Sequence, residues 1–156
     1  MIMKRIYLFV MMLLCSSALF AQAPSAYSLR VVNQTNCPVF YSVIGDEICV
    51  CGRNYQSGIM SLAPGGTATY ANTTFFPLPG SYPPIPKGIT GALIYSGSPA
   101  CQNPTTGVVG QPAPACTLPL NYSYLGLGYQ CERCSDIRVR WIPANNCQEY
   151  AQLIFY

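Results

Sequence analysis

Carboxylates are the only side chains of this sequence that offer a familiar route to acid–base catalysis. None of the 156 residues is a histidine, which excludes Ser-His-Asp and Cys-His nucleophiles and imidazole metal sites. Glycoside hydrolysis needs only two carboxyl groups, and the candidate pair takes one from Asp46 or Glu47 and one from Glu132 or Asp136. A structural interpretation competes with this one, because the first two residues follow Gly45 at a turn and the other two lie beside arginines. The sequence leaves catalysis undecided and favours a non-catalytic role.

Cysteines are the second group of residues with chemistry of their own. The chain has nine, of which Cys15 lies in the N-terminal leader described below. An even number of cysteines in an exported chain is typical of a disulfide framework. The eight predicted disulfide cysteines are Cys37, Cys49, Cys51, Cys101, Cys116, Cys131, Cys134 and Cys147.

The spacing of the cysteines predicts one local disulfide. Cys101 and Cys116 bracket a proline-rich stretch, and closing that loop would stabilise the fold by about 3 kcal/mol through its effect on the unfolded chain. A second bond, from Cys37 to Cys147, would connect the first strands to the last. The other four cysteines would then share two bonds.

These four cysteines form two close pairs, which permit two alternatives. Cys49-x-Cys51 and Cys131-x-x-Cys134 together could supply four thiolates to zinc, although the first spacing is tighter than zinc sites use and export favours oxidation. The second pair could be redox-active, but such a pair needs a helix N-terminus, and the residues that follow it alternate like a strand. The prediction is therefore no metal and no cofactor.

Residues 1–21 have the organisation of a secretory signal peptide. Lys4 and Arg5 precede a run of nine apolar residues, and smaller residues follow. Nine apolar residues are too few to span a bilayer, which takes about 20. We predict cleavage after Ala21 and a single mature domain, residues 22–156, that has no membrane span and is secreted, either extracellular or periplasmic.

Removing the leader changes the charge of the chain. The full sequence has a net charge of +3, whereas residues 22–156 carry six basic and five acidic side chains. A net charge of +1 gives no electrostatic reason to expect nucleic acid or an anionic membrane as partner. The length suits one domain with its own core.

Alternation of apolar and polar residues predicts about eight strands and no helix after the leader. The predicted strands are 29–33, 39–44, 59–63, 67–73, 89–95, 118–125, 137–141 and 151–156. Turn residues join the first two strands, and also the next two, into hairpins. This pattern predicts an all-β fold, a disulfide-stapled antiparallel β-sandwich.

Prolines concentrate in the middle of the chain. Ten of the fourteen lie between Pro77 and Pro119, and because proline cannot donate to a sheet ladder, most of this region is expected to be loop or edge. The longest irregular stretch is expected at 96–117, and no charged residue lies between its two cysteines. A constrained, neutral loop of this kind could bind an uncharged partner.

Three segments near the start of the mature chain resemble a known family. Leu29–Asn33, then Cys37–Phe40, then the Ser61–Gly65 turn look like the opening of thaumatin-like proteins. The resemblance covers about residues 28–70 and implies a secreted, disulfide-rich β-sandwich. The later chain departs from that family, with no counterpart of its acidic cleft residues, so the resemblance carries over no functional residue.

Tyrosines give the clearest indication of binding. Eleven lie after the leader, and a tyrosine presents a flat apolar face with a hydroxyl to sugars or proteins. Ordinary strand propensity explains tyrosines equally well. The two hypotheses are a secreted binding or structural module for a glycan or a protein surface, and a small carbohydrate-active hydrolase. The predicted binding residues are Tyr55, Tyr82, Gln102, Asn103, Tyr122, Tyr124 and Tyr129.

Overall fold

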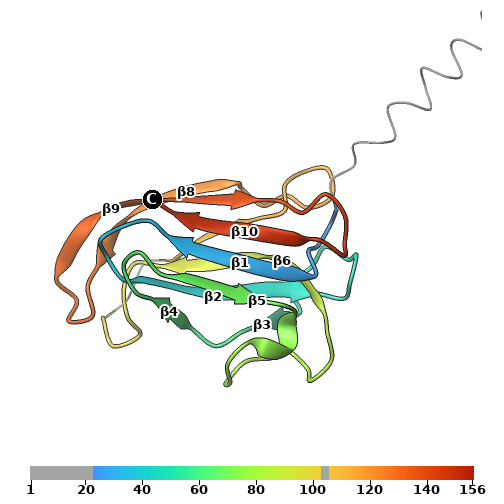
Figure 1. The fold of residues 1–156 in the computed structure, drawn as a ribbon, viewed down its shortest axis with the longest axis horizontal. Coiled ribbons are helices and arrows are strands. Elements are labelled where there is room, and N and C mark those ends of the chain that lie inside the picture. The colour runs from blue at the N-terminus through green and yellow to red at the C-terminus, as the bar shows by residue number, and fades with distance from the viewer. Residues whose placement is uncertain (1–22, 103–105) are drawn as a thin grey trace, which may run out of the picture.

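The computed structural model describes residues 23–102 and 106–156, which form ten strands and one short 3-10 helix (Figure 1). The predicted signal peptide and the predicted contact Asn103 lie outside these residues. The helix, η2, spans Thr73–Phe75. The strands are β1 (Ser28–Asn33), β2 (Val39–Asp46), β3 (Tyr55–Gln56), β4 (Met60–Leu62), β5 (Thr67–Tyr70), β6 (Gly88–Tyr95), β7 (Thr106–Gly110), β8 (Asn121–Leu127), β9 (Arg133–Ile142) and β10 (Tyr150–Phe155).

The strands form two sheets of five. The β9 sheet has the order β5-β1-β10-β9-β8, and the β2 sheet has the order β3-β2-β6-β7 with β4 also paired to β2. The predicted all-β, two-sheet, disulfide-stapled fold is confirmed. One pairing differs from a purely antiparallel sandwich, because β1 runs parallel to β10, with Val31 opposite Leu153. Side chains alternate between the two faces of a sheet in the same way in parallel and in antiparallel strands, so the sequence pattern carries no information about strand direction.

The core lies between the two sheets and is built from the inward-facing residues of the long strands. Trp141 on β9 is only 1% exposed, as its alternation with Arg138 and Arg140 predicts. Burial of such large apolar side chains is the main favourable contribution to folding. The fully buried side chains include Leu29, Val31, Val39, Tyr41, Val43, Ile89, Ile94, Ile137, Trp141, Leu153 and Phe155.

Both predicted hairpins are wrong. The segments 29–33 and 39–44 do form strands, but β1 pairs with β5 and β10, whereas β2 pairs with β3, β4 and β6. The next two strands divide in the same way, because β4 pairs with β2 and β5 pairs with β1. Turn residues predict that the chain reverses, but they do not determine whether it returns within one sheet or crosses to the other.

Asn33 holds the two crossings together. It is 1% exposed, and its side-chain nitrogen donates to the carbonyl oxygens of Cys37 at 2.7 Å, Leu62 at 3.1 Å and Ala63 at 3.0 Å. Its side-chain oxygen accepts from the backbone and hydroxyl of Thr35 at 3.0 and 2.7 Å. One side chain therefore bonds to the backbone of both connections between the sheets and holds them next to each other.

The stretch 96–117 is not entirely irregular, contrary to expectation. Strand β7 lies within it and pairs with β6, with Val108 opposite Leu93, and Val109 is fully buried. Prolines on both sides and glycines at 107 and 110 hide this strand from a propensity argument. Tertiary pairing with β6 overrides that local preference.

Four disulfides use all eight predicted cysteines, and none of them is local. The bonds are Cys37–Cys134, Cys49–Cys147, Cys51–Cys116 and Cys101–Cys131, with sequence separations of 97, 98, 65 and 30 residues. The predicted Cys101–Cys116 and Cys37–Cys147 bonds are therefore wrong, as is the four-thiolate zinc alternative. Strand β7 explains the first error, because it separates its two flanking cysteines by roughly 17 Å of extended chain.

Strand β2 is buried along its whole length, on both faces. Val39, Tyr41 and Val43 face the core, and the other residues of the strand are covered on the outside of the sheet. At its start, Phe40 packs edge-on against Tyr129, with ring centroids 5.7 Å apart. At its end, β3 and the loop before β6 cover it, and the candidate site lies there.

Candidate binding site

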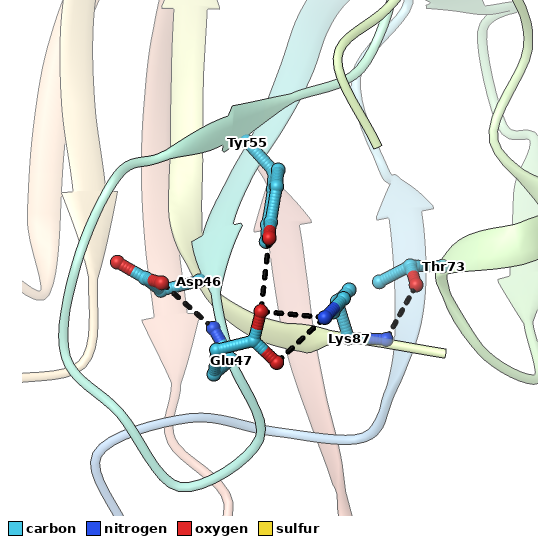
Figure 2. A network of polar contacts seen from close by, with 5 residues as sticks. All are labelled: Asp46, Glu47, Tyr55, Thr73 and Lys87. Carbon is cyan, nitrogen blue, oxygen red and sulfur yellow. Dashed lines mark hydrogen bonds and ion pairs between the residues drawn. The ribbon is translucent and has the colours of Figure 1, made fainter. Parts of the chain in front are cut away.

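The register of β2 and β6 brings two charged residues together. The strands are antiparallel, with Asp46 opposite Gly88, so the residue after β2 meets the residue before β6. These residues are Glu47 and Lys87, and the lysine nitrogen lies 2.5 and 2.6 Å from the two carboxylate oxygens (Figure 2). The ion pair therefore closes the end of the β2–β6 ladder.

Tyr55 completes this polar network. Its hydroxyl donates to Glu47 at 2.9 Å, and its ring lies 5.5 Å from the nitrogen of Lys87, within range of a cation–π contact (Figure 2). The hydrogen bond from Lys87, and then that from Tyr55, lower the pKa of Glu47. The hydrogen bond to Glu47 raises the pKa of Lys87 and that of Tyr55. The pKa shifts keep Glu47 negatively charged and Lys87 positively charged at neutral pH, and they keep the hydroxyl of Tyr55 protonated.

The connection from β5 to β6, residues 71–87, is named here the proline loop. The backbone nitrogen of Lys87 donates to the hydroxyl of buried Thr73 at 2.9 Å, which fixes the two ends of the loop to each other. Asn72 caps η2 by accepting from the backbone of Thr74 at 2.9 Å. Ser81 pins the middle of the loop to β3, because its backbone donates to Gln56 at 2.7 Å.

A row of aromatic rings connects Tyr55 to the core. Tyr55 and Tyr82 have ring centroids 5.6 Å apart, Tyr82 and Phe76 are 5.2 Å apart, and Phe76 and Tyr70 are 5.1 Å apart. The Tyr70 hydroxyl then lies 3.0 Å from that of buried Tyr41. The proline loop is therefore continuous with the core rather than detached from it.

Tyr82 lies at the centre of this row, and its hydroxyl is buried without a hydrogen-bond partner. Burial raises the pKa of Tyr82, and the carboxylate of Asp46 adds to the effect. The hydroxyl lies against Gly45, where a side chain would collide with it and with the carbonyl of Gly88. Glycine at position 45 thus allows the ring to close over the end of β2.

A pocket of about 300 Å³ lies within the proline loop, and Ser57, the residue after β3, also lines it. Leu78 on its wall is 82% exposed, and the neighbouring Phe75 is 62% exposed. Large apolar side chains that are exposed together mark interaction sites more often than single ones do. The pocket is lined by Ser57, Thr73, Thr74, Phe76, Pro77, Leu78, Gly80, Tyr82, Pro83 and Pro84.

The six predicted binding residues that the structure describes do not form one site. Tyr55 and Tyr82 do come together, as described above. Tyr122 and Tyr124 lie within β8, half-buried against the core, with their rings stacked 5.9 Å apart. Burial raises the pKa of Tyr124 and leaves its hydroxyl without a partner. Their alternation reflects sheet packing, the competing interpretation of the tyrosines.

Gln102 and Tyr129 lie at the opposite end of β2. Tyr129 is 56% exposed and packs on Phe40, and the Cys101–Cys131 bond brings exposed Gln102 to the same turn. Figure 1 shows this turn, between β8 and β9, at the far end of the molecule from η2. Gln102 and Tyr129 therefore belong to a region separate from Tyr55 and Tyr82.

The four candidate carboxylates are not brought together. Glu132 belongs to the β8–β9 turn, whose Tyr129 packs on Phe40 at the start of β2. Asp46 ends β2 and Glu47 follows it, at least six residues or roughly 20 Å along the strand from Phe40. Asp136 alternates outward on β9, on the other sheet. Glycosidase carboxyl groups lie about 5 to 10 Å apart, so this placement gives no support to the candidate pair.

The described residues contain neither a cluster of metal-ligating side chains nor a membrane-spanning helix. Within 23–102 and 106–156, no group of three or more His, Cys, Asp or Glu side chains is placed to hold a metal ion. In the same residues no helix has the length and apolar character needed to cross a membrane. Comparison with protein-family models, curated proteins and solved structures found no match to this chain.

Sequence reasoning missed most of the site. The sequence pattern places Phe76, Leu78 and Lys87 in a loop, because prolines interrupt every strand pattern there. One signal was present, namely that 75–85 combines apolar side chains with prolines and contains no charge. A polar surface loop rarely has that composition, and an apolar one has to be covered or bound.

Proposed function

We propose that the chain is an exported binding module that holds an apolar segment of a partner protein in the pocket of the proline loop. Its four disulfides suit an oxidising compartment outside the cytosol. The observation that carries the proposal is a pocket walled by prolines, aromatic rings and a leucine that is 82% exposed. Apolar side chains of a partner would bury this surface on binding.

The hydroxyl groups of the pocket favour a protein over a glycan. Ser57 donates to Gly58 at 2.8 Å, the Thr73 hydroxyl accepts from Lys87, and the Thr74 hydroxyl donates to Asn72 at 2.6 Å. The hydroxyl of Tyr82 is buried. A sugar requires polar groups that are free to bond its own hydroxyls, whereas these are already engaged or covered. An apolar side chain has no such requirement.

The contacts that hold the proline loop in one conformation also suit binding. The Glu47–Lys87 pair, the Ser81–Gln56 hydrogen bond and five prolines restrict its conformations before any partner arrives. A preorganised loop loses less conformational entropy on association, so more of the contact energy contributes to affinity. Disulfides hold the sheets that carry the loop.

Selection of peptides tests this proposal. A phage-displayed library of random peptides would be panned on the folded, oxidised protein lacking residues 1–21. We expect enrichment of peptides that contain aromatic or aliphatic residues, with affinity reduced at least tenfold by Leu78→Ser. Tyr150→Ser is the matched control, since it removes an apolar side chain that is 56% exposed at the start of β10 and should leave affinity unchanged.

Two results would contradict the proposal. Equal losses in the Leu78→Ser and Tyr150→Ser proteins would mean that the peptides bind exposed apolar groups without selectivity. Binding of neutral glycans on an array, abolished by Leu78→Ser, would assign the pocket to sugars instead of protein.

A further inference from the structure

A second surface, separate from the proline loop, lies on the outward face of the β9 sheet. The register places outward side chains of neighbouring strands side by side. Arg140 on β9 lies between Ile154 of β10 and Asn121 of β8. Arg138, two residues earlier on β9, lies between Ser123 of β8 and the backbone of Tyr156, with which it exchanges hydrogen bonds of 2.8 and 2.9 Å.

Arg30 extends the same face by two strands. It projects from β1 opposite Gln152 of β10, which in turn lies opposite Ile142 of β9. All three arginines are exposed. Three of the six basic residues that follow the leader thus share one side of one sheet. The net charge of the whole segment 22–156 is only +1. The overall charge conceals this local concentration.

Within the described residues, none of the three arginines forms an ion pair, although Asp136 lines a further hollow together with Arg138. All five acidic residues of the chain lie in the described ranges, and the ion pair found among these residues joins Lys87 to Glu47. Asp136 is the acidic residue among the outward positions of β9, and no arginine nitrogen lies within 4.0 Å of it. The guanidinium groups of this face are therefore available to a ligand.

Shallow hollows accompany these arginines. One of about 250 Å³ contains Arg138, and an adjoining one of about 400 Å³ contains Arg140; both are lined by Asn121 and Tyr156. A third, of about 400 Å³, combines Arg30 with Tyr150. Each hollow therefore offers a guanidinium and an exposed tyrosine ring.

We propose that this face binds an acidic polysaccharide, with the carboxylates of successive sugars on Arg138 and Arg140. A guanidinium binds a carboxylate through two parallel hydrogen bonds. The two arginines are separated by two residues of one strand, roughly 7 Å, and their long, flexible side chains can adjust to the spacing of the carboxylates along one extended chain. Tyr156 supplies a ring on which a sugar can stack, and the amide of Asn121 supplies hydrogen bonds to hydroxyls.

The geometry favours this ligand over other polyanions. The adjoining hollows follow Arg138 and Arg140 along β9, which suits an extended chain lying along this strand. Double-stranded nucleic acid and anionic membranes attract larger clusters of basic residues, typically four to eight for a membrane. Three arginines combined with tyrosines and neutral polar groups match a ligand that carries both charges and hydroxyls.

Calorimetric titration with a hexasaccharide of galacturonic acid tests the inference, using the oxidised protein lacking residues 1–21. Its fully methyl-esterified form, which keeps the sugar hydroxyls but blocks every carboxylate, is the matched ligand control. We expect binding of the acid and at least tenfold weaker binding of the ester. Arg138→Gln/Arg140→Gln should reduce affinity for the acid at least tenfold.

The matched protein control is Arg53→Gln/Arg133→Gln, which removes the same charge from positions outside this face. That variant should bind the acid as the unaltered protein does. Equal losses in the two double variants would show attraction to net charge alone and overturn the proposal, as would equal affinity for acid and ester. Tighter binding of a DNA duplex or of phosphatidylserine vesicles than of the hexasaccharide would assign the face to that partner instead.

The result is independent of the proposed function. Leu78→Ser should leave hexasaccharide binding intact, and the Arg138/Arg140 variant should leave peptide binding intact. Thermal unfolding of each variant verifies that the fold is retained, since all of these side chains are exposed.

Discussion

Lys87 and Glu47 are separated by 40 residues in the sequence, yet the lysine nitrogen lies within 2.6 Å of both carboxylate oxygens of the glutamate. The lysine side chain is 11% exposed and that of the glutamate is 51% exposed, so the pair lies at the boundary between the fold and solvent. It fixes the last residue of the proline loop to the end of β2. Loosening this contact should therefore affect the loop before it affects the sheets.

The first prediction concerns the pH dependence of this pair. The pKa of Glu47 is lowered from 4.5 in the folded protein, so its stabilisation is fully present above pH 4.5 and is lost as the pH falls through the folded-state pKa. Glu47→Gln should therefore have a lower Tm than the unaltered protein at pH 7, and the difference should shrink towards pH 3. Thermal unfolding followed by circular dichroism measures both.

The control for this experiment is Asp136→Asn, which removes an exposed carboxylate that has no ion pair on the described chain. Its Tm should follow that of the unaltered protein across the same pH range. A constant Tm difference between Glu47→Gln and the unaltered protein from pH 3 to pH 7 would show that the ion pair does not stabilise the fold.

The second prediction concerns Asn33. Asn33→Asp replaces a donor that satisfies three carbonyl oxygens with a charged acceptor facing them, in a site only 1% exposed. We expect a loss of about 3 kcal/mol or more in the free energy of unfolding, because the new carboxylate oxygen would be buried against carbonyl oxygens that cannot donate a hydrogen bond to it. Chemical denaturation measures it. Exposed Asn54→Asp is the control and should change stability by less than about 0.5 kcal/mol.

Strand positions were predictable from the sequence, because burial alternates along each strand and leaves a local pattern. The segment 89–95 differs from β6 by one residue at its start, 151–156 differs from β10 by one residue at each end, and 137–141 lies within β9. Pairing was not predictable in the same way. Whether β1 turns back on β2 or crosses to the other sheet depends on which surfaces become buried, and that information is spread over the whole chain.

The candidate site shows the same division. Tyr55 and Tyr82 were identified individually by residue type, but their contact with each other depends on how the proline loop folds over β3. The Glu47–Lys87 pair follows from the register of β2 and β6, which the sequence pattern left open. The arginines of β9 were recognised as exposed from their alternation with Trp141, whereas their neighbour Arg30 required the parallel β1–β10 pairing.

The third prediction concerns Trp141, which is 1% exposed in the core. Trp141→Ala should cost about 3 to 5 kcal/mol, the range for removing a large buried aromatic side chain. Trp141→Phe, which retains a ring, should cost less. Its indole nitrogen also donates to buried Gln111 at 3.4 Å, so both variants remove that bond and differ only in packing. Equal costs would mean that the hydrogen bond, not the volume, stabilises this part of the core.

The last prediction concerns the disulfide connectivity, which the sequence left open. Trypsin cuts after Arg133 and Arg138 and so isolates Cys134 in the peptide 134–138, while cleavage after Arg30 and Glu47 isolates Cys37 in the peptide 31–47. The Cys37–Cys134 bond predicts that these two peptides remain linked when the protein is digested with trypsin and a glutamate-specific protease without reduction.

Mass spectrometry of that digest distinguishes the structure from the sequence-based pairing. A Cys37–Cys147 bond would instead link 31–47 to 141–149, a species of different mass.

The exported protein should begin at Gln22 and contain no thiol that reacts with an alkylating reagent before reduction. Two or more reactive thiols would show that the framework does not close completely. The long separation of 97 residues makes Cys37–Cys134 worth about 4 to 5 kcal/mol on the loop-entropy model, so Cys37→Ser/Cys134→Ser should lower stability by up to that amount.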